Sequence, residues 1–286
     1  MGALLLVLDM IAQQGEGMTV RAYGKKHGIG GMFFNAVICL FAMVFFFVTD
    51  KGCLSFSKEL VAYGLVSCLM YATGFYAGYL AFQTGSYVAT KLISSFSVVI
   101  AIFYGILFLN EPAGVFTYIA ITVFVISMLM MNYRKTNESE RKDFSVKWLI
   151  CALLAAVSNG LIAVISREQQ LYFDGACDNE FMILSFGGAF AFLLVFGIVR
   201  EIKNIGYILK NGTLYGIIAG IFNGAKNFIG LALYLYIPIS VATPLKTGLG
   251  FILSFIISVL IYKEKFTKIQ IAGVALGAVS LVMFKL

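Results

Sequence analysis

The stretch "VATPLKTG" at residues 241–248 lies in a nearly unbroken apolar run and repeats an earlier phrase, "VATKLISS" at residues 88–95. Each copy carries a lysine, Lys91 in the first and Lys246 in the second. The same register continues downstream, where it pairs Glu111 with Glu264, Ser127 with Ser280 and Met130 with Met283. A repeat of this length predicts that the chain contains two copies of one structural unit.

The composition predicts an all-α integral membrane protein. Of the 286 residues, 60% are hydrophobic and only 12% are charged, and the mean hydropathy is +0.93. A soluble domain of this size needs a more highly charged surface. The 29 glycines and three prolines suit helices that pack closely in lipid.

Reading for apolar runs long enough to cross a bilayer, about 20 residues each, predicts ten transmembrane helices. They cover residues 2–22, 31–49, 59–82, 85–109, 113–132, 146–166, 180–200, 212–235, 238–262 and 267–285. The polar segment 133–145 divides them into five-helix repeats at 1–132 and 146–286. Because five is odd, consecutive copies enter the membrane in opposite senses, which predicts two inverted repeats with a substrate site near the midplane.

Two segments carry a resemblance to a known family. They are "YIPISVATPLKTGLGFILSFIISVLIYKEKFTKIQIAGVALGAVSLVMF" at 236–284 and "YVATKLISSFSVVIAIFYGILFLNEP" at 87–112. The sequence resembles the drug/metabolite transporter superfamily, in its EamA-like ten-helix branch. This resemblance implies transport of small molecules, in a family whose substrates include amino acids, drugs, nucleotide sugars, sugar phosphates and choline.

The last four helices of each repeat also resemble small multidrug resistance proteins, whose first helix carries a glutamate that serves proton and cationic drug. The equivalent positions here are Gln13 and Asn159, so this sequence departs from that pattern. Glu16, one turn beyond Gln13, is a candidate substitute.

Ionisable residues inside membrane helices are the main candidates for a binding site, because they are costly unless they serve a function. Lys246 lies about eight residues into its span, and Lys91 and Lys226 are also interior. Asn223, Lys226 and Asn227 follow helical spacing and predict one polar stripe. The alternative is structural: each lysine snorkels to the interface or pairs with an acid, for which Glu16 is the best candidate.

The predicted substrate-binding set combines these residues with polar and aromatic neighbours. It comprises Lys246, Lys226, Lys91, Gln13, Glu16, Asn159, Asn223, Asn227, Tyr71, Tyr79 and Thr243. Glu111 and Glu264, at corresponding helix ends, are expected to cap helix starts instead. Five cysteines without ligand spacing and one histidine predict no metal site, no cofactor and no enzyme activity.

The sequence therefore predicts a secondary transporter of a small organic metabolite, working by alternating access in a bacterial plasma (inner) membrane. The surplus of lysines over acids favours an anionic or zwitterionic substrate. The alternatives are a proton-coupled exporter of cationic drugs or quaternary amines that uses Glu16, and a non-transporting membrane scaffold. The expected partners are the substrate and membrane lipids, the oligomeric state is a monomer or homodimer, and no nucleic-acid binding is expected.

The net charge of +7 lies mainly in short loops and in the polar segment. The loops after the first, fifth, seventh and ninth spans are the basic ones. The bias of positive residues towards the cytoplasm then puts both termini outside. The family resemblance implies termini inside, so the orientation stays open.

Overall fold

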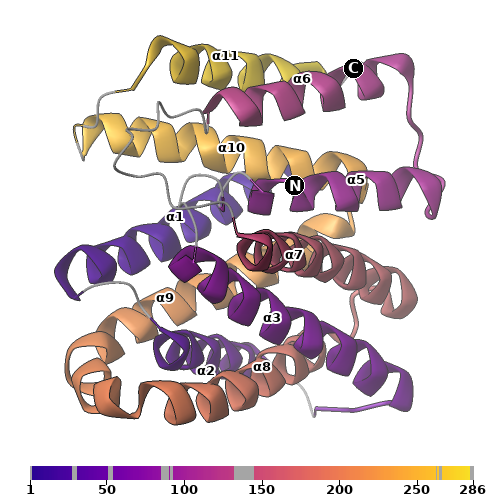
Figure 1. The fold of residues 1–286 in the computed structure, drawn as a ribbon. Helices are drawn as coiled ribbons and strands as arrows, with labels where there is room; N and C mark the ends of the chain where they lie inside the picture. The colour runs from indigo at the N-terminus through magenta and orange to yellow at the C-terminus, as the bar shows by residue number, and fades with distance from the viewer. Residues whose placement is uncertain are drawn as a thin grey trace. The chain divides into compact units, whose positions relative to one another are not determined.

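The computed structural model describes residues 2–27, 31–50, 54–84, 90, 93–131, 145–261, 263 and 266–283, and all regular elements in these ranges are helices. In chain order they are α1 (Gly2–His27), α2 (Met32–Thr49), α3 (Lys58–Thr84), α5 (Ser97–Leu107), α6 (Val115–Met131), α7 (Val146–Phe173), α8 (Asp178–Glu201), the short 3-10 turn η2 (Ile202–Asn204), α9 (Ile205–Tyr234), α10 (Ile239–Leu260) and α11 (Lys268–Met283) (Figure 1).

These helices suit a membrane protein. Five described segments are long and apolar enough to cross a membrane: Met32–Thr49, Lys58–Ala81, Val146–Phe173, Asp178–Tyr234 and Ile239–Leu260. Large apolar side chains also cover the outside, with Val48, Val115 and Leu260 each more than 70% exposed. Water penalises such a surface and hydrocarbon does not. The prediction of an all-α integral membrane protein is therefore confirmed, whereas the count of ten spans and their inversion stay predictions.

Several helices are longer than the apolar runs that predicted them. α1 continues to His27 and α7 to Phe173, and α9 begins at Ile205 although its apolar run begins at 212. The additional turns carry polar and basic residues. Helical hydrogen bonding therefore continues past the hydrophobic stretch, and a hydropathy reading does not detect this.

The helices form two compact units, and each unit draws on both predicted halves of the sequence. Unit 1 comprises residues 1–79 and 165–236, and unit 2 comprises 80–164 and 237–286. The segment 133–145 lies outside the described residues except for Ser145. The boundaries of the sequence repeats stay a prediction.

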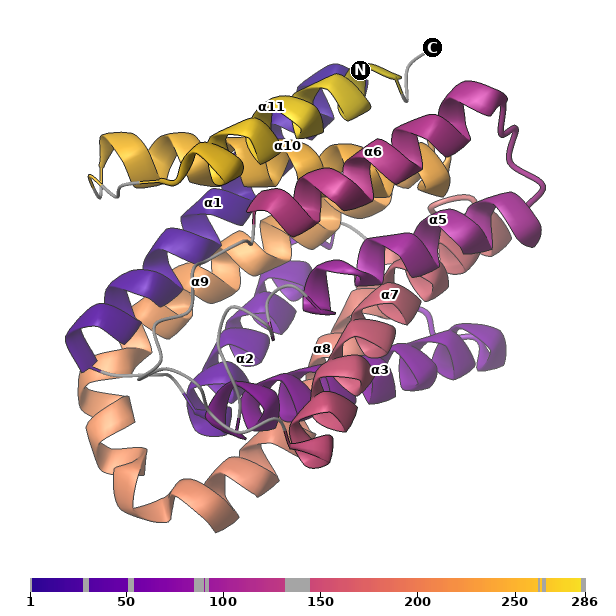
Figure 2. The ribbon, with the colours of Figure 1, turned by 45° about the horizontal axis from the view of Figure 1, so that its top comes forward.

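In unit 1, α2 packs between α8 and α9, and α1 lies alongside α9 (Figure 2). Glycines of α9 repeat every fourth residue against α2: a Cβ added at Gly216, Gly220 or Gly224 would meet Val37, Phe41 or Phe45 within 3 Å. Small residues at this spacing let two backbones approach closely, as is typical of helices that pack in lipid.

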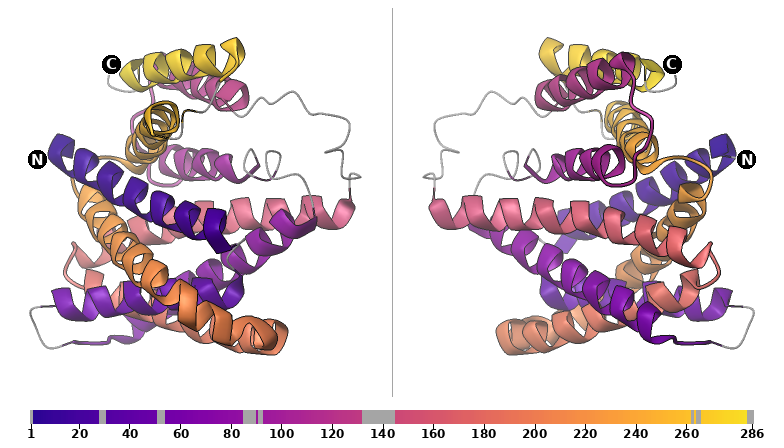
Figure 3. Two further views of the ribbon diagram at one scale, coloured as in Figure 1. Left: turned by 90° about the vertical axis from the view of Figure 1, so that its left-hand side faces the viewer. Right: turned by 90° about the vertical axis from the view of Figure 1, so that its right-hand side faces the viewer.

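In unit 2, α6 packs on α11 and α5 on α10, and both views of Figure 3 show α11 beside α6. Ile102, Phe124 and Leu281 are buried at the centre of this core. A polar contact joins the first turn of α7 to the same unit, because Trp148 donates its indole N–H to Thr90 Oγ1 over 2.8 Å. The core of each unit is therefore made by segments that are distant in the sequence.

Each unit contains a buried glutamate that caps the start of a distant helix. In unit 1, the Glu201 carboxylate accepts the backbone N–H groups of Met32 and Phe33, over 2.9 and 3.1 Å. In unit 2, Glu111 accepts those of Ile239 and Ser240, each over 2.8 Å. These donors are among the N–H groups that the first turn of a helix leaves without a partner.

A glycine makes room for each of these carboxylates. A Cβ at Gly31 would overlap the carboxylate of Glu201, and a Cβ at Gly105 would overlap that of Glu111. The expectation that Glu111 caps a helix is confirmed. The helix is α10, however, and not α6, which follows Glu111 in the sequence; Asn110 adopts a left-handed backbone (φ 52°) just before it. Glu264 lies outside the described residues.

Candidate functional site

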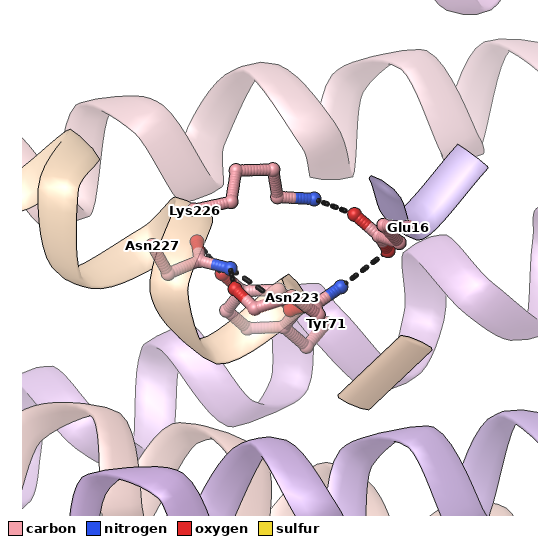
Figure 4. Close-up of polar contacts among 5 residues, drawn as sticks. All are labelled: Glu16, Tyr71, Asn223, Lys226 and Asn227. Atoms are coloured by element: carbon pink, nitrogen blue, oxygen red, sulfur yellow. Dashed lines mark hydrogen bonds and ion pairs between the residues drawn. The ribbon is translucent and has the colours of Figure 1, made fainter. Parts of the chain in front are cut away.

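A network of polar side chains joins the middle of α1 to α9 in unit 1 (Figure 4). The carboxylate of Glu16 is its centre. Glu16 Oε2 lies 2.6 Å from Lys226 Nζ, and Glu16 Oε1 accepts a hydrogen bond of 2.6 Å from Asn223 Nδ2. Both oxygens of the acid are thus held by side chains, one of them a cation.

The network continues from α9 to α3. Asn227 donates to the side-chain oxygen of Asn223 over 2.9 Å and also to its backbone oxygen over 2.8 Å. Tyr71 then donates its hydroxyl to Asn227 Oδ1 over 3.0 Å. Three helices therefore share one continuous set of hydrogen bonds, drawn together in Figure 4.

Helical spacing and close packing explain why these residues meet. Asn223, Lys226 and Asn227 are separated by three and four residues, so they lie on one face of α9. Gly15 of α1 packs directly on Phe222, where a Cβ would lie 2.6 Å from the ring, and this brings the next residue, Glu16, onto the polar face of α9.

The electrostatic balance of the network is neutral, with one acid and one base. The side chains of Lys226 and Glu16 are 26% and 19% exposed, so they are mostly but not fully buried. Attraction between opposite charges strengthens in a medium of low dielectric constant, but removing both charges from water is costly.

The structure brings five of the predicted site residues together, and all five belong to unit 1. They are Glu16, Tyr71, Asn223, Lys226 and Asn227. Gln13, one turn before Glu16, is half-buried, and its Oε1 is buried without a hydrogen bond. Tyr79 is half-buried in the same unit and makes none of the bonds described for the network.

The hydrogen bonds given above for this network involve none of the other predicted residues that the structure describes. Lys246 is half-buried and Thr243 is buried, both on α10 of unit 2, and the hydroxyl of Thr243 has no hydrogen-bond partner. Asn159 is exposed on the part of α7 that belongs to unit 2. Lys91 lies outside the described residues. These four residues remain predicted contacts only.

Two features escaped the sequence reading. Pro244 lies inside α10, two residues before Lys246. Proline lacks the N–H of a helical hydrogen bond, so it leaves a backbone carbonyl of the previous turn without its usual donor. Glu201 is the second: an acid at the carboxyl end of a helix opposes the helix dipole, and this mismatch is a signal that the carboxylate serves another helix.

One cavity of about 160 Å³ lies in unit 2 against α6, α10 and α11. Phe251, Phe255 and Phe266 line it together with Ser254, Ser258 and Gln270. None of the predicted site residues takes part in this lining. The polar network of unit 1 is therefore the stronger candidate for recognising a solute.

Comparison with known proteins establishes the fold and the family. A solved structure titled "Crystal structure of protein" superposes with a TM-score of 0.73 at 10% sequence identity, over 99% of this chain and 98% of that one. At this identity the likeness shows the fold alone. No curated protein matches the sequence significantly. Residues 146–286, the second half of the chain, match the EamA-like transporter family, and through this match the protein belongs to that family of the drug/metabolite transporter superfamily.

Proposed function

We propose that this protein is a secondary transporter that moves a small organic metabolite across the membrane by alternating access. Membership of the EamA-like family supports a membrane transporter of this type and not an enzyme. The observation that carries the proposal is the network of Glu16, Asn223, Lys226, Asn227 and Tyr71, because ionisable side chains in a membrane helix are costly and mark solute pathways. The pairing of Lys226 with Glu16 is also the one that the structural alternative predicts.

The proposed substrate is anionic or zwitterionic, and the ion pair favours the zwitterion. Lys226 alone would attract an anion, but Glu16 balances its charge at 2.6 Å. A molecule with both a carboxylate and an ammonium group can take the place of each partner, so that no charge is left uncompensated during binding. A simple anion would leave the charge of Glu16 uncompensated.

The proposed mechanism uses two inverted five-helix repeats that move around a bound substrate. Transporters of this architecture bind near the bilayer midplane, and helices interrupted near the site are a recurrent feature. In this protein α10 is continuous from Ile239 to Leu260, and Pro244 removes one of its backbone hydrogen bonds close to Thr243 and Lys246. The location we propose is the plasma membrane of a bacterium.

The test is a ligand screen by thermal unfolding of the purified protein in detergent, with amino acids, organic acids, sugar phosphates, nucleotide sugars and quaternary amines. A ligand that binds only the folded state raises its stability by RT ln(1 + [L]/Kd). We expect stabilisation by a zwitterion or anion that is lost in Glu16→Gln and Lys226→Gln and kept in Lys58→Ala, whose lysine begins α3.

Transport of the same ligand into proteoliposomes completes the test. Stabilisation by quaternary amines alone, lost in Glu16→Gln and kept in Lys226→Gln, would contradict the proposed substrate class and support the cation exporter. Wild-type uptake by both variants would remove the network from the mechanism.

A further inference from the structure

The two ends of unit 1 carry opposite charge. At the end where α1 and α8 finish and α9 begins, five cations are exposed: Lys25, Lys26, Arg200, Lys203 and Lys210. We call this set the basic end. Figure 1 draws it on the left, where the end of α1 lies close to the turn from α8 into α9, and Figure 2 agrees. His27 joins these two segments, because its Nδ1 lies 2.9 Å from the hydroxyl of Tyr207.

Acids gather at the opposite end of unit 1, where α2 and α7 finish and α3 and α8 begin. Five are Asp50, Glu59, Glu168, Asp174 and Asp178, the sixth, Glu180, is 8% exposed, and the cations Lys58 and Arg167 lie at the same end. Among the described residues, Glu201 is the acid that lies at the basic end. It is 8% exposed and accepts the N–H groups of Met32 and Phe33, so it does not face outwards to balance the five cations.

The basic end also presents apolar and aromatic surface. Ile202 is 66% exposed in the turn η2, and Tyr207 is 51% exposed in the first turn of α9. Arg200 lies over the ring of Tyr76, 5.4 Å from its centre, and this contact positions the guanidinium beside an aromatic face. Basic side chains beside exposed isoleucine and tyrosine are typical of the boundary between lipid headgroups and acyl chains.

We propose that the basic end of unit 1 binds the headgroups of anionic phospholipids. Membrane-spanning helices terminate there, so headgroups surround these side chains, and the cations are drawn to a negatively charged leaflet by about 1 kcal/mol each. The binding draws the basic end of unit 1 to the leaflet that is richer in anionic lipid. It needs neither substrate nor the Glu16 network.

The experiment titrates the purified protein in detergent with short-chain phosphatidylglycerol or phosphatidylcholine and reads bound lipid by native mass spectrometry. We expect phosphatidylglycerol to bind more tightly than phosphatidylcholine. The variant Lys25→Ala/Lys26→Ala/Lys203→Ala should weaken phosphatidylglycerol binding at least about tenfold, given about fivefold for each lysine before screening. Raising NaCl from about 0.05 to 0.5 M should weaken wild-type binding as well.

Two variants control for folding and for position. The triple Lys→Arg variant keeps the charge and should bind as the wild type does, and Lys58→Ala at the acidic end should also leave binding unchanged. Thermal unfolding in detergent without lipid confirms that each variant is folded. Equal binding of the two lipids by the wild type, unchanged binding by the triple alanine variant, or an equal loss in Lys58→Ala would overturn the proposal. Competition by inorganic phosphate at the same concentration as the lipid would identify a free-anion site and would also overturn it.

Discussion

Glu16 and Glu201 are both glutamates of unit 1, and each is held by two donors, but the donors differ in kind. Glu201 binds two backbone N–H groups at the start of α2. Glu16 binds two side chains, those of Lys226 and Asn223. Backbone donors are fixed by the helix that carries them, whereas a lysine and an asparagine can rotate away. The difference teaches that the kind of donor, more than burial, separates an acid held by the start of a helix from an acid whose partners are rotatable side chains.

The largest effect is expected from Glu201→Ala, because two N–H groups at a helix start then lose their acceptor. Each unsatisfied buried donor costs about 1 to 3 kcal/mol, so the variant should be about 2 to 4 kcal/mol less stable. Chemical unfolding in detergent measures the change. Glu201→Gln, which keeps one acceptor oxygen, should retain part of the stability; equal losses in both would contradict the capping role.

Glu111→Ala tests whether unit 2 depends on its cap to the same degree. Glu111 holds Ile239 and Ser240 at the start of α10, so we expect a loss of about 2 kcal/mol or more by the same argument. Hydrogen exchange should show the increased opening at the start of α10, with α2 unaffected. Equally increased exchange at the starts of α10 and α2 would show that the effect of the Glu111 cap is not confined to unit 2.

A smaller effect on stability and a larger one on binding are expected at the ion pair. Glu16→Gln and Lys226→Met should each cost about 1 to 2 kcal/mol, between the values for exposed and buried ion pairs, because a partly exposed charge can still be solvated when its partner is removed. The double variant should cost less than the sum of the two, with a coupling of about 0.5 to 3 kcal/mol for residues in direct contact. Additive losses would mean that the pair does not interact. Ligand stabilisation should disappear in all three variants, unlike in Glu201→Gln.

The smallest effect is expected from Tyr71→Phe. The variant loses the hydrogen bond to Asn227 and keeps the ring, which costs about 0.5 to 1.5 kcal/mol. Tyr76→Phe is a matched control on the same helix, since its ring still lies beneath Arg200. Thermal unfolding compares the two, and an equal loss in both would remove the network hydrogen bond as the cause.

The sequence predicted the parts of this arrangement that follow from local periodicity. The stripe of Asn223, Lys226 and Asn227 was visible from helical spacing, and Glu16 was the expected partner for a lysine because membrane spans contain few acids. Which lysine pairs with Glu16 depends on how α1 packs on α9. The contact of Gly15 with Phe222 sets this packing, and neither segment of sequence predicts it alone. The helix that Glu111 caps was not predictable for the same reason: the start of α10 lies 128 residues further along the chain.

The cap on α2 also constrains how the protein is made. Met32 and Phe33 lie 169 and 168 residues before the glutamate that satisfies them. At a synthesis rate of about 5 to 20 residues per second, the ribosome reaches Glu201 roughly 10 to 30 s after it has completed the start of α2. During that interval the N–H groups at the start of α2 must find other acceptors, in water, lipid headgroups or the insertion machinery. The start of α2 therefore acquires its cap only after the seventh predicted span has been synthesised, and a nascent chain stopped before Glu201 should remain sensitive to proteases at the start of α2.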